Sequence, residues 1–360
     1  MPVYAKGKVA GVEVVWNKFT SKEVLEAYGE LFGAYEGPTL ASADVKLTLE
    51  NLPTAVANAL RRVLCDEMIG YHLDFQNFSL ETTEVYMLPQ FVRTKINTIP
   101  LNSSIQDWSQ YRFSLDITNT TTATIYLYSG DLTVEESPGD NMIPFEPFSM
   151  ICSLEAGKRL KIDSIYVNEG RGIEHGSFSN MSAVTSTPLD LERRPLAETH
   201  DRGGASVDKS EYIESCLVAN PQKHLITGTI PACGKNARTV AQIILSNACN
   251  EIVDRLQVAA AAMEKNHQGP ATFILRPPEY GTGLEEGKLM IPNETHTIGN
   301  LLNRAIYDTK PDIANVNYTV GRSHMTLTVQ NDSGTVSKLV LDAINDCIEL
   351  FNRLSKAMLN

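Results

Sequence analysis

Residues 54–67 read TAVANALRRVLCDE, and residues 293–308 read NETHTIGNLLNRAIYD. Both stretches repeat apolar residues at i, i+3, i+4, i+7 and i+8, which form one face of an α-helix. The faces match at an offset of 242 residues and comprise Val56, Ala59, Leu60, Val63 and Leu64 in the first stretch and Ile298, Leu301, Leu302, Ala305 and Ile306 in the second. Asn58 and Arg62 match Asn300 and Arg304 at the same offset. The sequence therefore predicts one opening helix twice.

A second pair of helical stretches also repeats. RTVAQIILSNACNEIVDRL (238–256) resembles GTVSKLVLDAINDCIELFNRL (334–354), and Leu245 falls on Leu341 at an offset of 96 residues. Each copy thus has an opening and a closing helix, accompanied by alternating apolar and polar residues that indicate strands. From the matched Asn to the matched Leu, the first copy spans 187 residues and the second 41, so the first copy holds an insert of 187 − 41 = 146 residues.

We expect an α+β fold with two copies of a sheet-plus-two-helix dimerisation unit paired within one chain, the first interrupted by a mostly β insert. The insert is rich in β-branched and aromatic residues, which favour strands. Because each unit would leave one helix face uncovered, the copies would pack helix against helix across a pseudo-two-fold axis. Residues 1–43 are expected to form an extension, and residues 44–71 with 221–263 the first unit. The insert would span 72–220 and contain a flexible loop at 186–210. A linker at 264–270 would lead to the second unit at 271–360.

Composition narrows the possible functions. The 360 residues carry a formal net charge of −12, so the basic face of a tight nucleic-acid binder is not expected. No run of eighteen apolar residues indicates a transmembrane helix, and the N-terminus lacks the apolar core of a signal peptide, which favours an intracellular protein. The six cysteines form no CxxC pair, so a zinc or redox motif is not expected.

Several of these stretches resemble one protein family. VANALRRVL (56–64) resembles the signature helix of the bacterial RNA polymerase α subunit, shared with the third-largest subunit of RNA polymerase II and its archaeal counterpart. ETHTIGNLLNRAIYD (294–308) resembles the signature of the eleventh subunit of RNA polymerase II and of the matching small archaeal subunit. In the insert, EVYMLPQFVRTKINTIPL (84–101), YSGDL (128–132) and NEGRGIEHGSFSN (168–180) are similar to family stretches. The chain thus looks like a fusion of two subunits, as in some large nucleocytoplasmic DNA viruses.

The resemblance implies a non-catalytic assembly platform of a DNA-directed RNA polymerase that bridges the two large catalytic subunits. Its partners would be the largest and second-largest subunits and a small subunit of the tenth-subunit type. Nothing in the sequence resembles a catalytic triad or an NADFDGD-like metal-binding loop, so we expect no catalytic, cofactor or metal residue here. The Mg²⁺ and Zn²⁺ of the assembled polymerase would lie on other subunits. The expected location is the host cytoplasm in a viral factory, the nucleus, or the virion.

Two sets of contact residues are expected. Intramolecular pairing would use Val56, Leu60, Val63, Leu64, Ile298, Leu301, Leu302, Ile306, Leu245 and Leu341. Docking to the large subunits would use Asn58, Arg61, Arg62, Gly170, Arg171, Gly172, His175, Asn300 and Arg304. The resemblance implies that Arg61 and Arg62 reach the second-largest subunit, and the planar guanidinium suits bidentate contact with carboxylates or carbonyls. The alternative is that both are solvated surface charges.

Other features have simpler interpretations. GRGIEHG (170–176) lacks the GxxxxGK[ST] pattern of a phosphate-binding loop and is expected to be a docking turn. His296 is expected to cap a helix or lie at an interface, and Glu285 and Glu286 are expected to be solvated loop charges. Two other functions stay open: a free-standing dimerisation adaptor outside any polymerase, and a small-molecule enzyme with its site in the insert.

Overall fold

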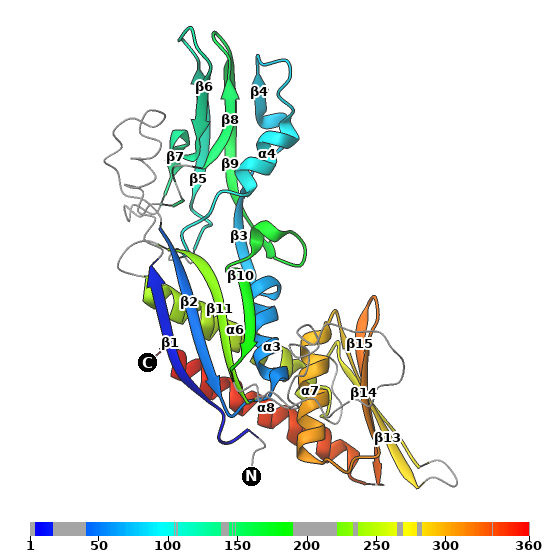
Figure 1. Cartoon of the computed structure of the whole chain (residues 1–360). Coiled ribbons are helices and arrows are strands. Elements are labelled where there is room, and N and C mark those ends of the chain that lie inside the picture. The colour runs from blue at the N-terminus through cyan, green and yellow to red at the C-terminus, as the bar shows by residue number, and fades with distance from the viewer. Residues whose placement is uncertain are drawn as a thin grey trace, which may run out of the picture.

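The computed structural model describes residues 4–16, 41–103, 105, 107–137, 144–145, 147, 149–189, 222–232, 237–264, 269–278, 283–332 and 334–359. Antiparallel sheets and helices make up two regions: a helix layer lined by two sheets, and a β-rich region that projects away from it (Figure 1). The expected α+β class is therefore confirmed.

The first sheet has the strand order β1-β2-β11-β10. Its strands are β1 (Lys8–Trp16), β2 (Ala41–Glu50), β10 (Ser182–Pro188) and β11 (Lys223–Ala232), and its helices are α3 (Thr54–Arg62) and α6 (Ala237–Ala261). Val45, Leu47 and Leu49 alternate along β2 and are all buried, because one face of the sheet packs on the helices. A single π-helical turn, η1 (Val63–Glu67), extends α3.

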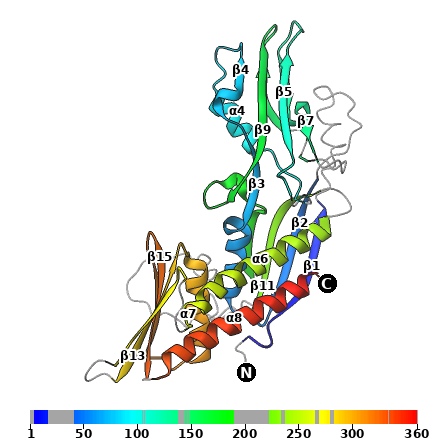
Figure 2. The same cartoon turned by 180° about the vertical axis from the view of Figure 1, so that it is seen from behind.

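The second sheet has the order β12-β13-β15-β14. Its strands are β12 (Thr272–Arg276), β13 (Leu284–Pro292), β14 (Asn315–Val320) and β15 (His324–Asp332), and its helices are α7 (His296–Thr309) and α8 (Val336–Leu359). Helices α6 and α8 lie side by side in both views (Figures 1 and 2). One continuous apolar core includes buried side chains from both sheets and all four helices.

The β-rich region has its own apolar core, centred on side chains such as Phe75, Tyr111 and Phe113. Its strands are β3 (Ile69–Asp74), β4 (Leu80–Thr82), β5 (Arg112–Thr118), β6 (Ile125–Tyr128), β7 (Thr133–Glu136), β8 (Met150–Leu154) and β9 (Arg159–Arg171). Helix α4 (Pro89–Asn97) and the short turns η2 (Asn77–Ser79), η3 (Ser129–Asp131) and η4 (Gly176–Phe178) complete it. Two separate cores mean that the β-rich region packs largely on itself.

Two strands lie in other parts of the fold than the sequence indicated. Strand β10 falls within the expected insert but pairs with β11 in the first sheet, and β1 falls within the expected extension but pairs with β2. Strand β10 is mostly Ser and Thr and lacks an apolar alternation, so its sequence did not indicate a buried sheet position. Residues 190–210 of the expected flexible loop and 265–268 of the expected linker lie outside the described residues.

Candidate interface site

The structure brings nine of the ten expected pairing residues into one core. Each is at most 1% exposed: Val56, Leu60, Val63, Leu64, Leu245, Ile298, Leu301, Leu302 and Ile306. They come from the two opening helices, η1 and α6, and α3 packs directly against α7. The apolar stripes of α3 and α7 therefore cover each other as well as the sheets.

Leu341 is the exception, because its side chain is 36% exposed. In the middle of the closing helices, burial follows an offset of 98 residues, which matches Cys249 to Cys347 and Leu256 to Leu354, all fully buried. A difference of two residues turns a position by about 200° around a helix with 3.6 residues per turn. The expected pairing role of Leu341 is therefore wrong, and Leu245 matches Ala343 instead.

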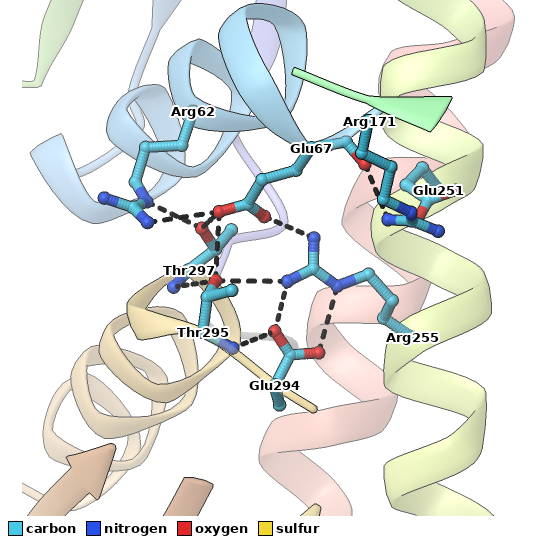
Figure 3. A network of polar contacts seen from close by, with 8 residues as sticks. All are labelled: Arg62, Glu67, Arg171, Glu251, Arg255, Glu294, Thr295 and Thr297. Atoms are coloured by element: carbon cyan, nitrogen blue, oxygen red, sulfur yellow. Dashed lines mark hydrogen bonds and ion pairs between the residues drawn. The ribbon is translucent and has the colours of Figure 1, made fainter. Parts of the chain in front are cut away.

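A buried polar network crosses the helix layer (Figure 3). Its centre is Glu67, only 3% exposed, at the end of η1. Arg255 Nη1 of α6 donates to Glu67 Oε2 at 2.5 Å, and Arg62 Nη2 donates to Oε1 at 3.2 Å. The hydroxyls of Thr295 and Thr297, at the start of α7, donate to the same Oε1 at 2.9 and 2.7 Å. One carboxylate thus binds donors from α3, α6 and α7.

Arg255 and Arg171 extend this network in two directions. Arg255 also forms a two-point ion pair with the buried carboxylate of Glu294, just before α7. Arg171, the last residue of β9, donates through Nη1 to the Glu67 carbonyl oxygen at 2.6 Å and to Glu251 Oε1 of α6 at 2.8 Å. Three arginines therefore face three glutamates, and the network ties the β-rich region to the helix layer.

The surroundings keep Glu67 charged although it is buried. Burial alone would raise the pKa of Glu67, but the charge and hydrogen bonds of Arg255, with those of Thr297 and Thr295, outweigh it and lower the pKa below its usual value. Desolvation alone would lower the pKa of Arg255, but the hydrogen bonds that Arg255 donates to Glu294 and Glu67, and the charges of both carboxylates, raise it. Glu67 and Arg255 are therefore held as an ion pair in the interior.

The predicted docking arginines differ in how the chain holds them. Arg62 Nε also donates to Thr297 Oγ1 at 2.8 Å, so Arg62, like Arg171, belongs to the internal network. Arg61 donates from Nε to Asn58 Oδ1 at 3.0 Å and stays half-buried at the surface of α3. Arg304 pairs with Asp308 one turn later on α7, where half-buried Asn300 also lies. Arg61 is the least engaged of the four arginines.

Glycines shape the predicted docking turn. A Cβ on Gly170 would lie 2.6 Å from the Phe178 ring, and one on Gly172 would lie 2.9 Å from the Asp66 Cα. Both contacts are too close for a side chain, so glycine at Gly170 makes room for the Phe178 ring, and glycine at Gly172 lets the turn pack against η1. Its Ile173 N–H donates to the Asp66 carbonyl at 2.9 Å.

The same turn exposes an apolar residue that sequence analysis did not select. Ile173 is 60% exposed although its backbone is fixed. Exposed His175 caps η4 by accepting from the Ser177 backbone N–H. A cavity of about 490 Å³ lies beside Ile173 and the network, between this turn, α6 and the start of α7. Ile173 was missed because an isolated isoleucine between glycines and charged residues forms no periodic pattern.

Three local expectations need correction. The cap of α7 is Thr295, whose hydroxyl accepts from the Thr297 N–H, whereas His296 is exposed and meets the Tyr318 ring edge-on. Glu285 is not a solvated loop charge: it lies on β13, is 7% exposed and accepts from the Val336 N–H at the start of α8. Glu286, also on β13, pairs with Lys288 and Arg276.

The described residues offer no group of three or more His, Cys, Asp or Glu side chains that could hold a metal ion. Burial raises the pKa of the Cys249 and Cys347 thiols, so both stay protonated inside the helix layer. Among the helices of the described part, none is long and apolar enough to cross a membrane.

Comparison with known proteins points to transcription. No family model matches the chain. Two relatives named "DNA-directed RNA polymerase RPB3-11 homolog", from Kenyan and Malawian isolates of African swine fever virus, are each 28% identical to it over 354 residues, covering 94% of this chain and 94% of the relative. The likeness therefore spans both sheets, the helix layer and the β-rich region. Over nearly its whole length the chain is thus similar to viral proteins named as homologues of an RPB3-11 RNA polymerase subunit, which confirms the resemblance predicted from its sequence.

Proposed function

We propose that this chain is the non-catalytic assembly platform of a DNA-directed RNA polymerase and bridges its two large subunits. The observation that carries the proposal is the likeness to viral RPB3-11 homologues over 94% of both chains. The fold supports it: each four-stranded sheet has two helices, and the four helices pack together in one core. These would be two dimerisation units, near 44–71 with 221–263 and at 271–360, joined within one chain.

The first docking surface would centre on Arg61 and Ile173. Arg61 lies on α3, and the turn that carries Ile173 packs against η1, which extends that helix. A half-buried guanidinium beside a fixed, exposed isoleucine offers a partner both a charged and an apolar contact. The second-largest subunit would bind here. Arg62 and Arg171 belong to the buried network. They would hold α3 and the turn in place beneath this surface and would not contact the partner.

A second surface would be the outer end of the β-rich region. Large apolar side chains around α4 are strongly exposed there: Phe78 85%, Val85 79%, Tyr86 89% and Phe91 67%. Exposed apolar patches on a soluble chain commonly mark protein interaction sites. We assign this one to another polymerase subunit, and the largest subunit and a small tenth-type subunit would complete the set of partners. The complex would work in the host cytoplasm or nucleus, or in the virion.

The test is co-expression of the full chain with the two largest polymerase subunits of the same virus, followed by purification through a tag on this chain. The double variant Arg61→Ala with Ile173→Asp should lose most of the second-largest subunit while keeping the wild-type melting curve. Val134→Asp, at another exposed apolar position in β7, is the matched control and should retain it. A wild-type chain that purifies with neither large subunit at physiological salt would instead support the free-standing adaptor.

A further inference from the structure

The two closing helices carry arginines at matching positions with different partners. Arg255 and Arg353 are 98 residues apart, as are Cys249 and Cys347, so they occupy equivalent places on α6 and α8. Arg255 binds the carboxylates of Glu67 and Glu294. Arg353 instead donates through Nη2 to the Tyr4 carbonyl oxygen at 2.7 Å and through Nη1 to that of Ala5 at 2.8 Å. An N-terminal segment therefore takes the place that carboxylates hold at the other junction.

Tyr4 is anchored between the helices of the second unit. Its side chain is 5% exposed and belongs to the main apolar core. Its hydroxyl donates to Asp308 Oδ2 of α7 at 3.2 Å, and Asp308 is already ion-paired with Arg304. Burial also raises the pKa of the Tyr4 phenol, so the hydroxyl keeps the proton that it donates. The ring and backbone of Tyr4 thus contact both α7 and α8.

The next residues bind the first unit. The Gly7 N–H donates to the Tyr4 carbonyl at 2.9 Å and closes a turn, and a Cβ on Gly7 would overlap the Leu52 side chain. Asn51 Nδ2 donates to the Lys6 carbonyl at 3.3 Å. Strand β1 then pairs with β2 from Lys8–Glu50 to Trp16–Ala43, and it also contacts α6 and α8. One short segment therefore contacts both units.

We propose that residues 4–16 form a strap that fastens the two units to each other. Tyr4 occupies a binding site built by α7 and α8, Arg353 holds the strap by its backbone, and β1 fixes the other end on the first sheet. Arg353 binds the backbone carbonyls of the strap, so this contact does not depend on side-chain type. The apolar surroundings of the ring and the hydrogen bond to Asp308 favour a tyrosine at position 4. The partner of this site is the chain's own N-terminus, and the proposal does not depend on the polymerase role.

The test turns the strap into a separate peptide. A specific protease site is placed between residues 20 and 35 of the full chain, which is cut after folding. The dissociation rate of the cut N-terminal peptide is then measured in the presence of an excess of unlabelled peptide 1–19. The wild-type peptide should stay bound, and Tyr4→Ala or Arg353→Ala should speed its release at least about tenfold, the effect of losing one hydrogen bond to a charged group.

Two controls separate the strap from general damage. Lys338→Ala removes an exposed cation from the same helix as Arg353 and should release the peptide at the wild-type rate. Tyr4→Phe keeps the ring but loses the bond to Asp308, so its rate should lie between wild type and Tyr4→Ala. Hydrogen exchange of α7 and α8 in the uncut variants should rise in Tyr4→Ala and Arg353→Ala only. If both variants matched Lys338→Ala in release and in exchange, residues 4–16 would not be a strap.

Discussion

Replacing Arg255 by Met tests the buried network most directly. Methionine keeps much of the length and apolar stem of arginine but removes all five N–H donors. Glu67 and Glu294, 3% and 7% exposed, would then face each other without the cation that binds both. Glu67 would keep Arg62, Thr295 and Thr297 as donors, whereas Glu294 would lose its two-point ion pair.

The structure also sets the size of the expected effect. Removing one partner of a buried ion pair typically costs about 3–5 kcal/mol, because an uncompensated charge is left in the interior. The same substitution at Arg159 is a matched control, since Arg159 makes a two-point ion pair with Asp116 in which both side chains are nearly half exposed. An exposed pair of this kind contributes about 0–1 kcal/mol. Both variants remove an arginine that makes a two-point ion pair with a carboxylate, but only the Arg255 pair is buried.

Urea unfolding of the full chain would measure this difference, with fluorescence reporting on the transition that includes the helix layer. Arg255→Met should lower the stability of that transition by several times more than Arg159→Met. Equal losses in the two variants would refute the argument that the network is a buried, mutually dependent set of charges.

The stability of Arg255→Met should also depend on pH differently from that of the wild type. In the wild type, the pKa of Glu67 is lowered, so its contribution to stability is complete above its unfolded pKa of about 4.3 and is lost as the pH falls through the folded pKa. In Arg255→Met, a carboxyl left without its cation should have a raised pKa. The stability loss relative to wild type should therefore be smaller near pH 5 than near pH 7.5.

Three further outcomes follow from other parts of the structure. Leu302→Asp places a carboxylate at a fully buried position and should cost more than the roughly 1.5–3 kcal/mol of an ordinary buried leucine, as measured by unfolding. Gly299→Ala would drive a Cβ into the Tyr318 ring and should cost about 1–3 kcal/mol, whereas Gly11→Ala, with open space around it, should be close to neutral in the same assay. Elemental analysis of the purified full chain should find no stoichiometric zinc, and one cysteine-bound zinc per chain would contradict this expectation.

The helix faces were predictable because their signal is local. Leu60 and Leu302 fall on apolar stripes that can be read within fifteen residues, and the repeat of the stripe indicates a second unit without any structure. The closing helices show the limit of that approach. An offset of 96 residues aligns Thr, Val and Leu at their starts, but burial follows 98 from Leu245 and Ala343 onward, and only three-dimensional packing shows that Leu341 lies on the solvent side.

The buried network could not be derived from the sequence in the same way. Glu67 and Arg255 are 188 residues apart, and a glutamate after a helix usually signals a solvated end rather than a core position. The π-helical turn adds to the difficulty, because it buries Glu67 while the neighbouring Asp66 stays exposed. The resemblance to the family predicts the docking turn, and close packing explains its glycines, Gly170 against Phe178 and Gly172 against η1. The exposed Ile173 leaves no periodic pattern by which the sequence could reveal it.

The network also bears on why the first unit would pair with the second rather than with a copy of itself. At the offset of 242 residues, Glu294 and Thr295 of the second unit match Leu52 and Pro53 of the first. A pair of two first units would therefore leave Arg255 with Glu67 of its own unit but without a second carboxylate at this position. Since losing one partner of a buried ion pair costs several kcal/mol, the network favours the second unit as the partner of the first. The second junction needs no such carboxylate, because Arg353 is bound by the backbone of Tyr4 and Ala5. The asymmetry of the two junctions thus comes from the carboxylates at one of them and from the N-terminal segment at the other.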